Sequence, residues 1–242
     1  CTELALKLVK QGRIPVSRLN ESCRRVFRLK FELGLFDNPY VDESKALEIC
    51  NKEEFVEAGR DAMRKSLVLL KNSSENDTPV LPLTGSVKVY IEGFDKDLVN
   101  KYAQVVKTPE EANFALLNLK TPSRLDLREL FGLIFKQGDL DFTEKQLKKL
   151  KKVMNVCPTI VNLYLDRPAV IPELKEQASA IIGNFSVSPD IVLDLIFGKF
   201  KPTGKLPFEL PSSMEAVRNQ RSDVPYDSDN PLYSFGHGLS YE

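Results

Sequence analysis

The stretch DIVLDLIFGKFKPTGKLPFELP, residues 190–211, decides how this chain folds. Residues 190–197 place apolar side chains at helical spacing, and Gly198 follows them as a helix stop. A turn that contains Pro202 and Gly204 comes next. Residues 205–210 alternate as a short strand does, and a proline ends that pattern. The stretch therefore predicts a helix, a tight turn and a strand in direct succession.

A second informative stretch closes the chain, with the sequence LYSFGHGLSY at residues 232–241. It holds two glycines among aromatic side chains. Glycine bends the backbone and lets another chain segment approach closely. We therefore expect this stretch to be packed tightly against the domain rather than to form a free tail.

Upstream of these two stretches, strand patterns alternate with helix patterns. Such an alternation is typical of a mainly parallel sheet that is covered by helices on both faces. The buried strands near the middle are expected where apolar runs are continuous. The strands are expected at residues 87–91, 112–119, 159–165 and 180–185, and the helices at residues 96–106, 143–156, 172–179 and 189–197.

The N-terminal part has a different pattern, because predicted helices dominate it. Amphipathic helices are expected at residues 3–12 and 18–33, with glycines as their stops and Ser17 as the cap of the second. A linker over residues 38–50, a helix over residues 52–65 and an extended segment over residues 66–72 follow. The apolar stripe of the second helix needs a partner, which could be the rest of this chain or a second copy of it.

Composition excludes several classes of partner. Lys and Arg together number 34, as do Asp and Glu, so the formal net charge is zero and nothing favours nucleic acid or an anionic membrane. No apolar run approaches the length of a membrane-spanning helix. The four cysteines are scattered, which favours free thiols over a disulfide framework. The start, Cys1-Thr2-Glu3, predicts a fragment, a processed product or one domain of a longer protein.

The stretch at residues 196–211, together with PLYSFGHGLSY at residues 231–241, resembles the C-terminal domain of glycoside hydrolase family 3. The shared pattern is a helix that ends in Phe-Gly, a Pro-Thr-Gly-Lys-Leu-Pro turn and a closing Phe-Gly-x-Gly-Leu-Ser-Tyr. Residues 12–42 resemble the end of the N-terminal barrel domain of the same family. Residues 66–72 and 80–83 resemble its entry into the C-terminal domain.

This resemblance implies a fold and an organisation. The fold is α/β, a three-layer sandwich with a mainly parallel sheet of about six strands, preceded by a helical N-terminal arm. Residues 1–37 would be the terminal helices of a barrel domain that lies outside this chain. Residues 38–84 would be a linker and entry segment, and residues 85–242 the sandwich domain. The partners implied are a carbohydrate substrate, bound together with the barrel, and a homodimer through the N-terminal helices as a further option.

The resemblance also implies a function, that of one domain of a retaining β-glycosidase similar to a β-glucosidase. Retention needs two carboxyl groups about 5 Å apart. In the family the nucleophile lies on the barrel, so this chain alone is expected to be inactive. The acid/base is often a glutamate that precedes a segment matched here by residues 140–146. No cofactor is expected.

The candidate site residues lie in one long connection, residues 120–141. It follows a strand, and ligands of open α/β sheets bind beyond the carboxyl ends of strands. Glu129 is the acid/base candidate and Asp126 the alternative, although a solvated loop carboxylate is at least as good an interpretation of Glu129. The candidates for substrate binding are Arg124, Arg128 and Asp139.

Other motifs and functions can be compared with the same sequence. A phosphate loop at Gly198–Lys205 fails, because five residues separate its glycines and Leu206 stands where Ser or Thr is needed. No serine hydrolase or zinc protease motif occurs, and no metal site has proper ligand spacing. His237 is expected to be structural, as are Lys71 and Asn72. A non-catalytic carbohydrate-binding or interface module is the alternative function. The shortened loop at residues 186–190 suggests an unusual substrate or a weakened site.

Overall fold

The computed structural model describes residues 2–73, 77–122 and 138–241, and it divides the chain into two compact units. The first unit is Cys1–Phe55 and the second is Val56–Glu242.

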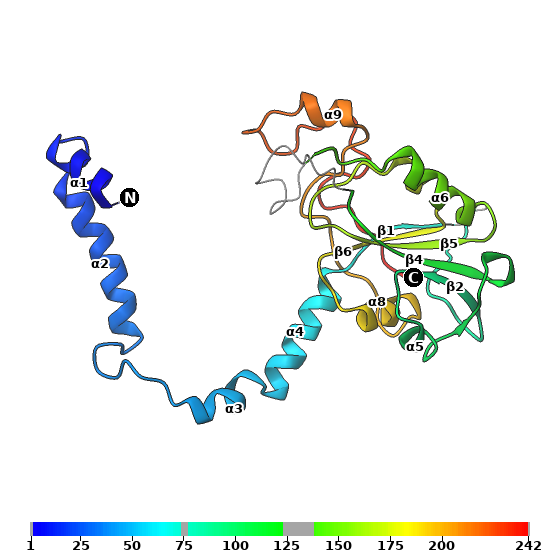
Figure 1. Cartoon of the computed structure of the whole chain (residues 1–242), viewed down its shortest axis with the longest axis horizontal. Helices are drawn as coiled ribbons and strands as arrows, with labels where there is room; N and C mark the ends of the chain where they lie inside the picture. The colour runs from blue at the N-terminus through cyan, green and yellow to red at the C-terminus, as the bar shows by residue number, and fades with distance from the viewer. Residues whose placement is uncertain (1, 74–76, 123–137, 242) are drawn as a thin grey trace. The chain divides into compact units, whose positions relative to one another are not determined.

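The first unit is helical (Figure 1). Its helices are α1 (Thr2–Lys10), α2 (Val16–Glu32), η1 (Glu43–Lys45) and α3 (Ala46–Cys50), and the last two replace the linker expected over residues 38–50. The predicted cap was wrong, because α2 begins at Val16 with Pro15 at the N-cap and Ser17 lies inside the helix. Gly34 ends the helical run with φ of +67°, as expected of a helix stop.

The second unit contains one six-stranded sheet in the order β1-β6-β5-β4-β2-β3. All neighbouring pairs are parallel except β1 with β6, which is antiparallel. The expectation of a mainly parallel sheet of about six strands is therefore confirmed. The strands are β1 (Val68–Asn72), β2 (Lys88–Glu92), β3 (Gln104–Val105), β4 (Phe114–Lys120), β5 (Thr159–Tyr164) and β6 (Ala180–Asn184).

Helices cover both faces of this sheet, which makes the three-layer sandwich that the sequence predicts (Figure 1). One apolar core lies between the sheet and the helices α6 and α7. The other lies between the sheet and the helices α5 and α8. Strands β5 and β6 contribute to both cores, since alternate side chains of a strand point to opposite faces. The helices of this unit are α4 (Glu53–Ser66, mostly here), α5 (Lys96–Val99), α6 (Glu144–Met154), α7 (Pro172–Gln177), α8 (Pro189–Ile196) and α9 (Met214–Asn219).

Local signals account for the helix starts that were predicted well. Thr143 caps α6 in a capping box, in which its hydroxyl accepts from the Gln146 backbone N–H and the Gln146 side chain reaches back. Pro172 and Pro189 occupy the first turns of α7 and α8, where the missing N–H costs nothing.

Two local predictions in this unit were wrong, and one helix was missed. The helix expected over residues 96–106 is only the four-residue α5, and it is followed by the short strand β3. The strand expected over residues 205–210 is an irregular segment with a single bridge from Leu210 to Tyr233. Helix α9 was not predicted, although Ser213 caps it by accepting from the Ala216 N–H at 3.0 Å.

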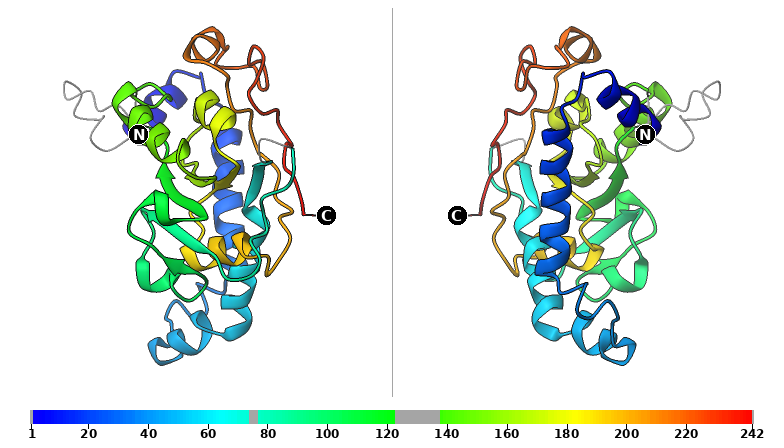
Figure 2. Two further views of the ribbon diagram at one scale, coloured as in Figure 1. Left: turned by 90° about the vertical axis from the view of Figure 1, so that its right-hand side faces the viewer. Right: turned by 90° about the vertical axis from the view of Figure 1, so that its left-hand side faces the viewer.

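The C-terminal segment packs closely against the sheet domain, as its glycines predict. Figure 2 shows this segment, in red, beside the cyan strand β1, and the Leu239 N–H donates to the Leu69 carbonyl at 2.8 Å. A Cβ on Gly238 would overlap the Gly204 backbone oxygen. His237 Nε2 lies 2.8 Å from the Leu70 carbonyl oxygen. This histidine therefore has the structural contact expected of it.

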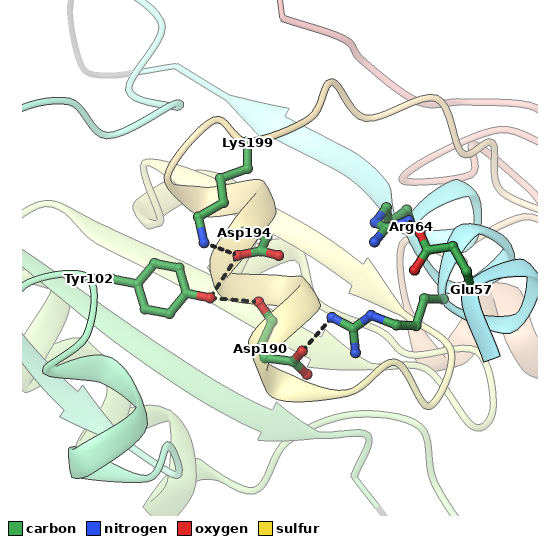
Figure 3. A network of polar contacts seen from close by, with 7 residues as sticks. Glu57, Arg64, Tyr102, Asp190, Asp194 and Lys199 are labelled. Carbon is green, nitrogen blue, oxygen red and sulfur yellow. Dashed lines mark hydrogen bonds and ion pairs between the residues drawn. The ribbon is translucent and has the colours of Figure 1, made fainter. Parts of the chain in front are cut away.

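Helix α8 also anchors the elements packed around it (Figure 3). Arg60 of α4 places Nη2 2.7 Å from Asp190 Oδ2. The Tyr102 hydroxyl donates to Asp194 Oδ1 at 2.7 Å, and Lys199 Nζ lies 2.7 Å from the same oxygen. Burial, together with the hydrogen bond to Asp194, raises the pKa of Tyr102. These contacts fix α4 to the N-terminal turn of α8 and the segment after α5 to its C-terminal turn.

Candidate functional site

The carboxyl ends of four parallel strands meet at one edge of the sheet. Strands β2, β4, β5 and β6 run in the same direction, so the loops that follow them lie together. Ligands of open α/β sheets bind at this edge. The carboxyl edge is therefore the candidate site, and two pockets lie along it.

The first pocket lies on the α8 side of the sheet and has a volume of about 350 Å³. Polar side chains from three neighbouring strands supply much of its lining, and one tyrosine and one valine add apolar surface. No carboxylate is among the lining residues that the structure describes. They are Gly93, Asn118, Lys120, Tyr164, Asn184, Ser186 and Val187.

A short chain of side-chain amides begins at this pocket and runs into the sheet. Asn118 Nδ2 donates to the Gly93 carbonyl at 2.9 Å. Asn118 therefore turns its oxygen toward β5, where Asn162 Nδ2 donates to it at 2.8 Å. The two residues are paired in the register of β4 and β5. The Gly93 carbonyl can only accept a hydrogen bond, so it fixes the orientation of the Asn118 amide. Asn118 in turn fixes the orientation of the Asn162 amide.

The oxygen of Asn162 has no hydrogen-bond partner within the described part of the chain, although the residue is only 2% exposed. Its Nδ2 is held by Asn118, so Oδ1 is turned away from that residue. A buried carbonyl oxygen without a donor costs about 1–3 kcal/mol. Asn162 lies on the same face of the sheet as Tyr164 and Asn184. These two residues are closer to the carboxyl edge and line the pocket.

The loop after β6 is shaped by the third asparagine. Asn184 Oδ1 accepts from the Val187 N–H at 2.7 Å, and Ser186 between them has φ of +67°. A left-handed backbone at a residue other than glycine is uncommon and needs local support. The Asn184 amide supplies that support and leaves the Ser186 side chain exposed at the pocket rim.

The second pocket, of about 330 Å³, lies on the α6 side of the same edge, and Glu92 is its only carboxylate among the described lining residues. Lys149 Nζ lies 2.6 Å from Glu92 Oε2. The Tyr90 hydroxyl donates to Glu92 Oε1 at 2.9 Å, and burial and this bond raise the pKa of Tyr90. Both oxygens of Glu92 therefore have partners, which does not suit a proton-donating carboxyl group.

The two ends of the long connection after β4 are held by residues that follow β5. The Thr121 hydroxyl donates to Asp166. At the other end, Arg167 Nη2 donates to the backbone oxygens of Gly138 and Asp139. Both described ends of this connection therefore lie at the carboxyl edge of the sheet.

Of the site residues predicted from the sequence, Arg124, Asp126, Arg128 and Glu129 lie outside the described residues. Asp139 is described, and its Oδ1 lies 3.4 Å from Arg218 Nη2. Its role in substrate binding stays a prediction. The sequence analysis did not single out Asn118 or Asn162, although each interrupts an otherwise apolar strand, whereas Asn184 stands at a strand end where ligand binding was expected. That interruption was the available signal, since asparagine is depleted in strands.

Two further residues that were expected to be structural have such contacts. Asn72 Oδ1 accepts from the Val80 and Leu81 N–H groups, at 3.0 and 2.8 Å. Lys71 Nζ donates to the Lys175 and Glu176 carbonyls at the end of α7, at 2.7 and 3.3 Å. Burial, and then the nearby Lys175, lower the pKa of Lys71.

Within residues 2–73, 77–122 and 138–241, no group of three or more His, Cys, Asp or Glu side chains is arranged to hold a metal ion. The three described cysteines, Cys23, Cys50 and Cys157, are free. No helix among the described residues is long and apolar enough to cross a membrane.

Comparison with known proteins agrees with this fold. Residues 90–241 match the model of the glycosyl hydrolase family 3 C-terminal domain. The chain is 44% identical over 244 residues to "Beta-glucosidase C" of Emericella nidulans, a match that covers 99% of this chain and 39% of that protein. It is 35% identical over 242 residues to "Periplasmic beta-glucosidase/beta-xylosidase" of Dickeya chrysanthemi, with 98% and 36% covered.

A solved structure is similar over nearly the whole chain. The β-glucosidase from Listeria innocua in complex with glucose superposes with a TM-score of 0.70 at 20% identity, covering 98% of this chain and 40% of that one. This chain thus spans about two fifths of the relatives it matches. The family model and the curated relatives together show that the chain belongs to glycosyl hydrolase family 3, with residues 90–241 forming its C-terminal domain.

Proposed function

We propose that this chain is the C-terminal part of a retaining β-glucosidase and forms one side of the sugar site, with a barrel domain forming the other. The observation that carries the proposal is the 44% identity to a β-glucosidase over 99% of the chain. The polar carboxyl edge supports it, because amides and hydroxyls are the groups that hydrogen-bond sugar hydroxyls.

Within this proposal, Glu129 is the acid/base and Asp126 the alternative. Retaining glycosidases need a proton donor about 5 Å from the nucleophile. Glu92 is a poor donor because Lys149 and Tyr90 already occupy both of its oxygens. The anchored ends of the connection after β4 support a donor in that segment. Arg124, Arg128 and Asp139 are proposed to bind substrate from the same rim.

The test is Glu129→Gln in the protein that contains the barrel. Only substrates with poor leaving groups need the proton, so their turnover should fall far more than that of activated aryl glucosides, by about 10²–10⁴-fold. Asp126→Asn is the matched variant and should change both substrates little. Equal slowing of both substrates by Glu129→Gln, or none, would remove Glu129 from this role and leave Asp126 or a barrel residue.

The N-terminal unit is proposed to dock on the barrel. We propose residues 1–37 as its terminal helices, residues 38–84 as linker and entry segment, and residues 85–242 as the sandwich domain. The exposure of the apolar residues of α2 supports this, since none of them is buried. A homodimer through these helices is the alternative, and sedimentation of the 242-residue chain against concentration distinguishes the two.

A second function is favoured by one observation. The described side chains of the first pocket include amides and no carboxylate, which suits a non-catalytic carbohydrate-binding or interface module. Activity of the barrel-containing protein that survives replacement of both Glu129 and Asp126 would favour this alternative.

A further inference from the structure

The pocket on the α8 side of the sheet has the features of a built binding site. The lining residues that the structure describes come from strands β4, β5 and β6 and from the loops after β2 and β6. Asn118 and Asn184 come from strands on either side of β5, and Asn162 of β5 lies between them on the same face, one pleat below the pocket. Two amides therefore line the pocket, and the third, Asn162, is hydrogen-bonded to one of them.

The unsatisfied group in this cluster is an acceptor, and it defines the missing partner. Asn162 Oδ1 cannot exchange places with its own nitrogen, because Asn118 presents an oxygen to it. The group that satisfies it must therefore be a hydrogen-bond donor such as a hydroxyl. A buried atom of this kind in a native fold calls for a bound molecule or a solvent molecule to complete it.

The charge around the pocket favours a neutral ligand over an anion. Lys120 is the one charged side chain among the described lining residues, and it lies exposed at the rim. The other polar groups of the lining are amides, a seryl hydroxyl and a tyrosine hydroxyl. An anion would meet the Asn162 oxygen unfavourably, whereas a polyol can donate to that oxygen and accept from the rim. The volume of about 350 Å³ is at the small end of ligand sites, which suits one ring.

We propose that this pocket binds one neutral sugar ring, with Asn118 and Asn162 at its floor and Asn184 and Ser186 at its rim. The inference rests on the proposed function for the choice of a sugar among neutral polyols. It adds a subsite in the C-terminal domain whose four proposed contact residues all lie outside the connection after β4.

The experiment is an NMR titration of the ¹⁵N-labelled 242-residue chain with methyl β-D-glucopyranoside. We expect saturable shifts of the asparagine side-chain amide signals, with Kd in the range of about 1–50 mM for a single ring. Sodium gluconate is the anionic control and should bind more weakly. No saturable shift up to about 100 mM would contradict the proposal, and an ordered water as the only occupant gives this result.

Three variants locate the binding. Asn162→Leu removes the buried acceptor and should abolish the shifts. Ser186→Ala changes only an exposed rim side chain, so it keeps the test valid if the first variant unfolds, and it should weaken binding about three- to tenfold. Asn113→Ala removes an amide that accepts from the Lys88 N–H at the opposite edge, and it should leave Kd unchanged. Unchanged Kd in both pocket variants would overturn the assignment.

The result is separable from the test of the proposed function. Glucosidase activity of the barrel-containing protein without binding here would remove this subsite alone. Binding here without such activity would leave the pocket as a sugar site of a non-catalytic module.

Discussion

Helices α2 and α8 are both amphipathic, yet their apolar faces meet different surroundings. Five of the eight residues of α8 are buried against the sheet. None of the 17 residues of α2 is buried. Leu193 of α8 is 0% exposed and Leu29 of α2 is 57% exposed. The difference indicates that the sandwich completes its own core, whereas the N-terminal unit does not bury the apolar face of α2 with its own residues.

The largest effect should come from the matched substitutions Leu193→Ala and Leu29→Ala. Truncating a buried leucine removes its transfer energy and leaves a cavity, so Leu193→Ala should lower the free energy of unfolding of the sandwich by about 2–5 kcal/mol. Leu29→Ala should change it by less than about 0.5 kcal/mol. Urea unfolding followed by near-UV tyrosine circular dichroism measures both. A large loss for Leu29→Ala would mean that α2 is packed within this chain.

A smaller effect is expected where the C-terminal segment closes the sandwich. An alanine at Gly238 would place its Cβ against the Gly204 backbone oxygen, so Gly238→Ala should destabilise by about 1–3 kcal/mol. Gly59→Ala is the control, because that glycine lies in α4 with open space around it and no positive φ. It should stabilise by up to about 1 kcal/mol. Equal effects of the two variants would contradict the close packing of the C-terminal segment.

The smallest effects compare two buried tyrosines. The Tyr241 hydroxyl donates to the Leu195 carbonyl at 2.8 Å, whereas the Tyr233 hydroxyl has no partner among the described residues. Tyr241→Phe should cost about 1 kcal/mol and Tyr233→Phe close to nothing. Thermal unfolding at neutral pH measures both. A larger cost for Tyr233→Phe than for Tyr241→Phe would show that the unpartnered hydroxyl is satisfied after all.

The same tyrosines predict a pH dependence. Burial raises the pKa of both groups. The unfolded tyrosines ionise near pH 10, at about their ordinary pKa, while the folded ones stay neutral. Their contribution to stability is complete below that pH and is lost as pH rises toward the folded pKa. Urea midpoints should therefore fall above about pH 10, and each phenylalanine variant should show a smaller fall. Identical slopes in all three proteins would contradict this.

Elements set by local signals were predicted from the sequence, and those set by distant contacts were not. Helices α6 and α8 and the central strands follow from local caps, prolines and apolar runs, so they were predicted closely. The segment at residues 205–210 alternates like a strand, but its contacts are made with the distant residues Tyr233 and His237, so local pattern failed there. The Asn118–Asn162 pair depends on the register of β4 against β5, which no local pattern records.

The candidate site shows the same limit. The sequence indicated the carboxyl edge, because strand ends are readable from apolar runs. It did not indicate which groups at that edge remain unsatisfied. Glu92 could be removed as a proton donor only once its contacts with Lys149 and Tyr90 were known.

One measurement tests most directly the proposal that this chain supplies one side of a glucosidase site and is inactive without the barrel. The direct measurement is hydrolysis of an aryl β-glucoside by the purified 242-residue chain, and then by the protein with the barrel attached. The account predicts no turnover by the chain alone and turnover by the longer protein. Turnover by the chain alone, or none by the correctly folded longer protein, would contradict it.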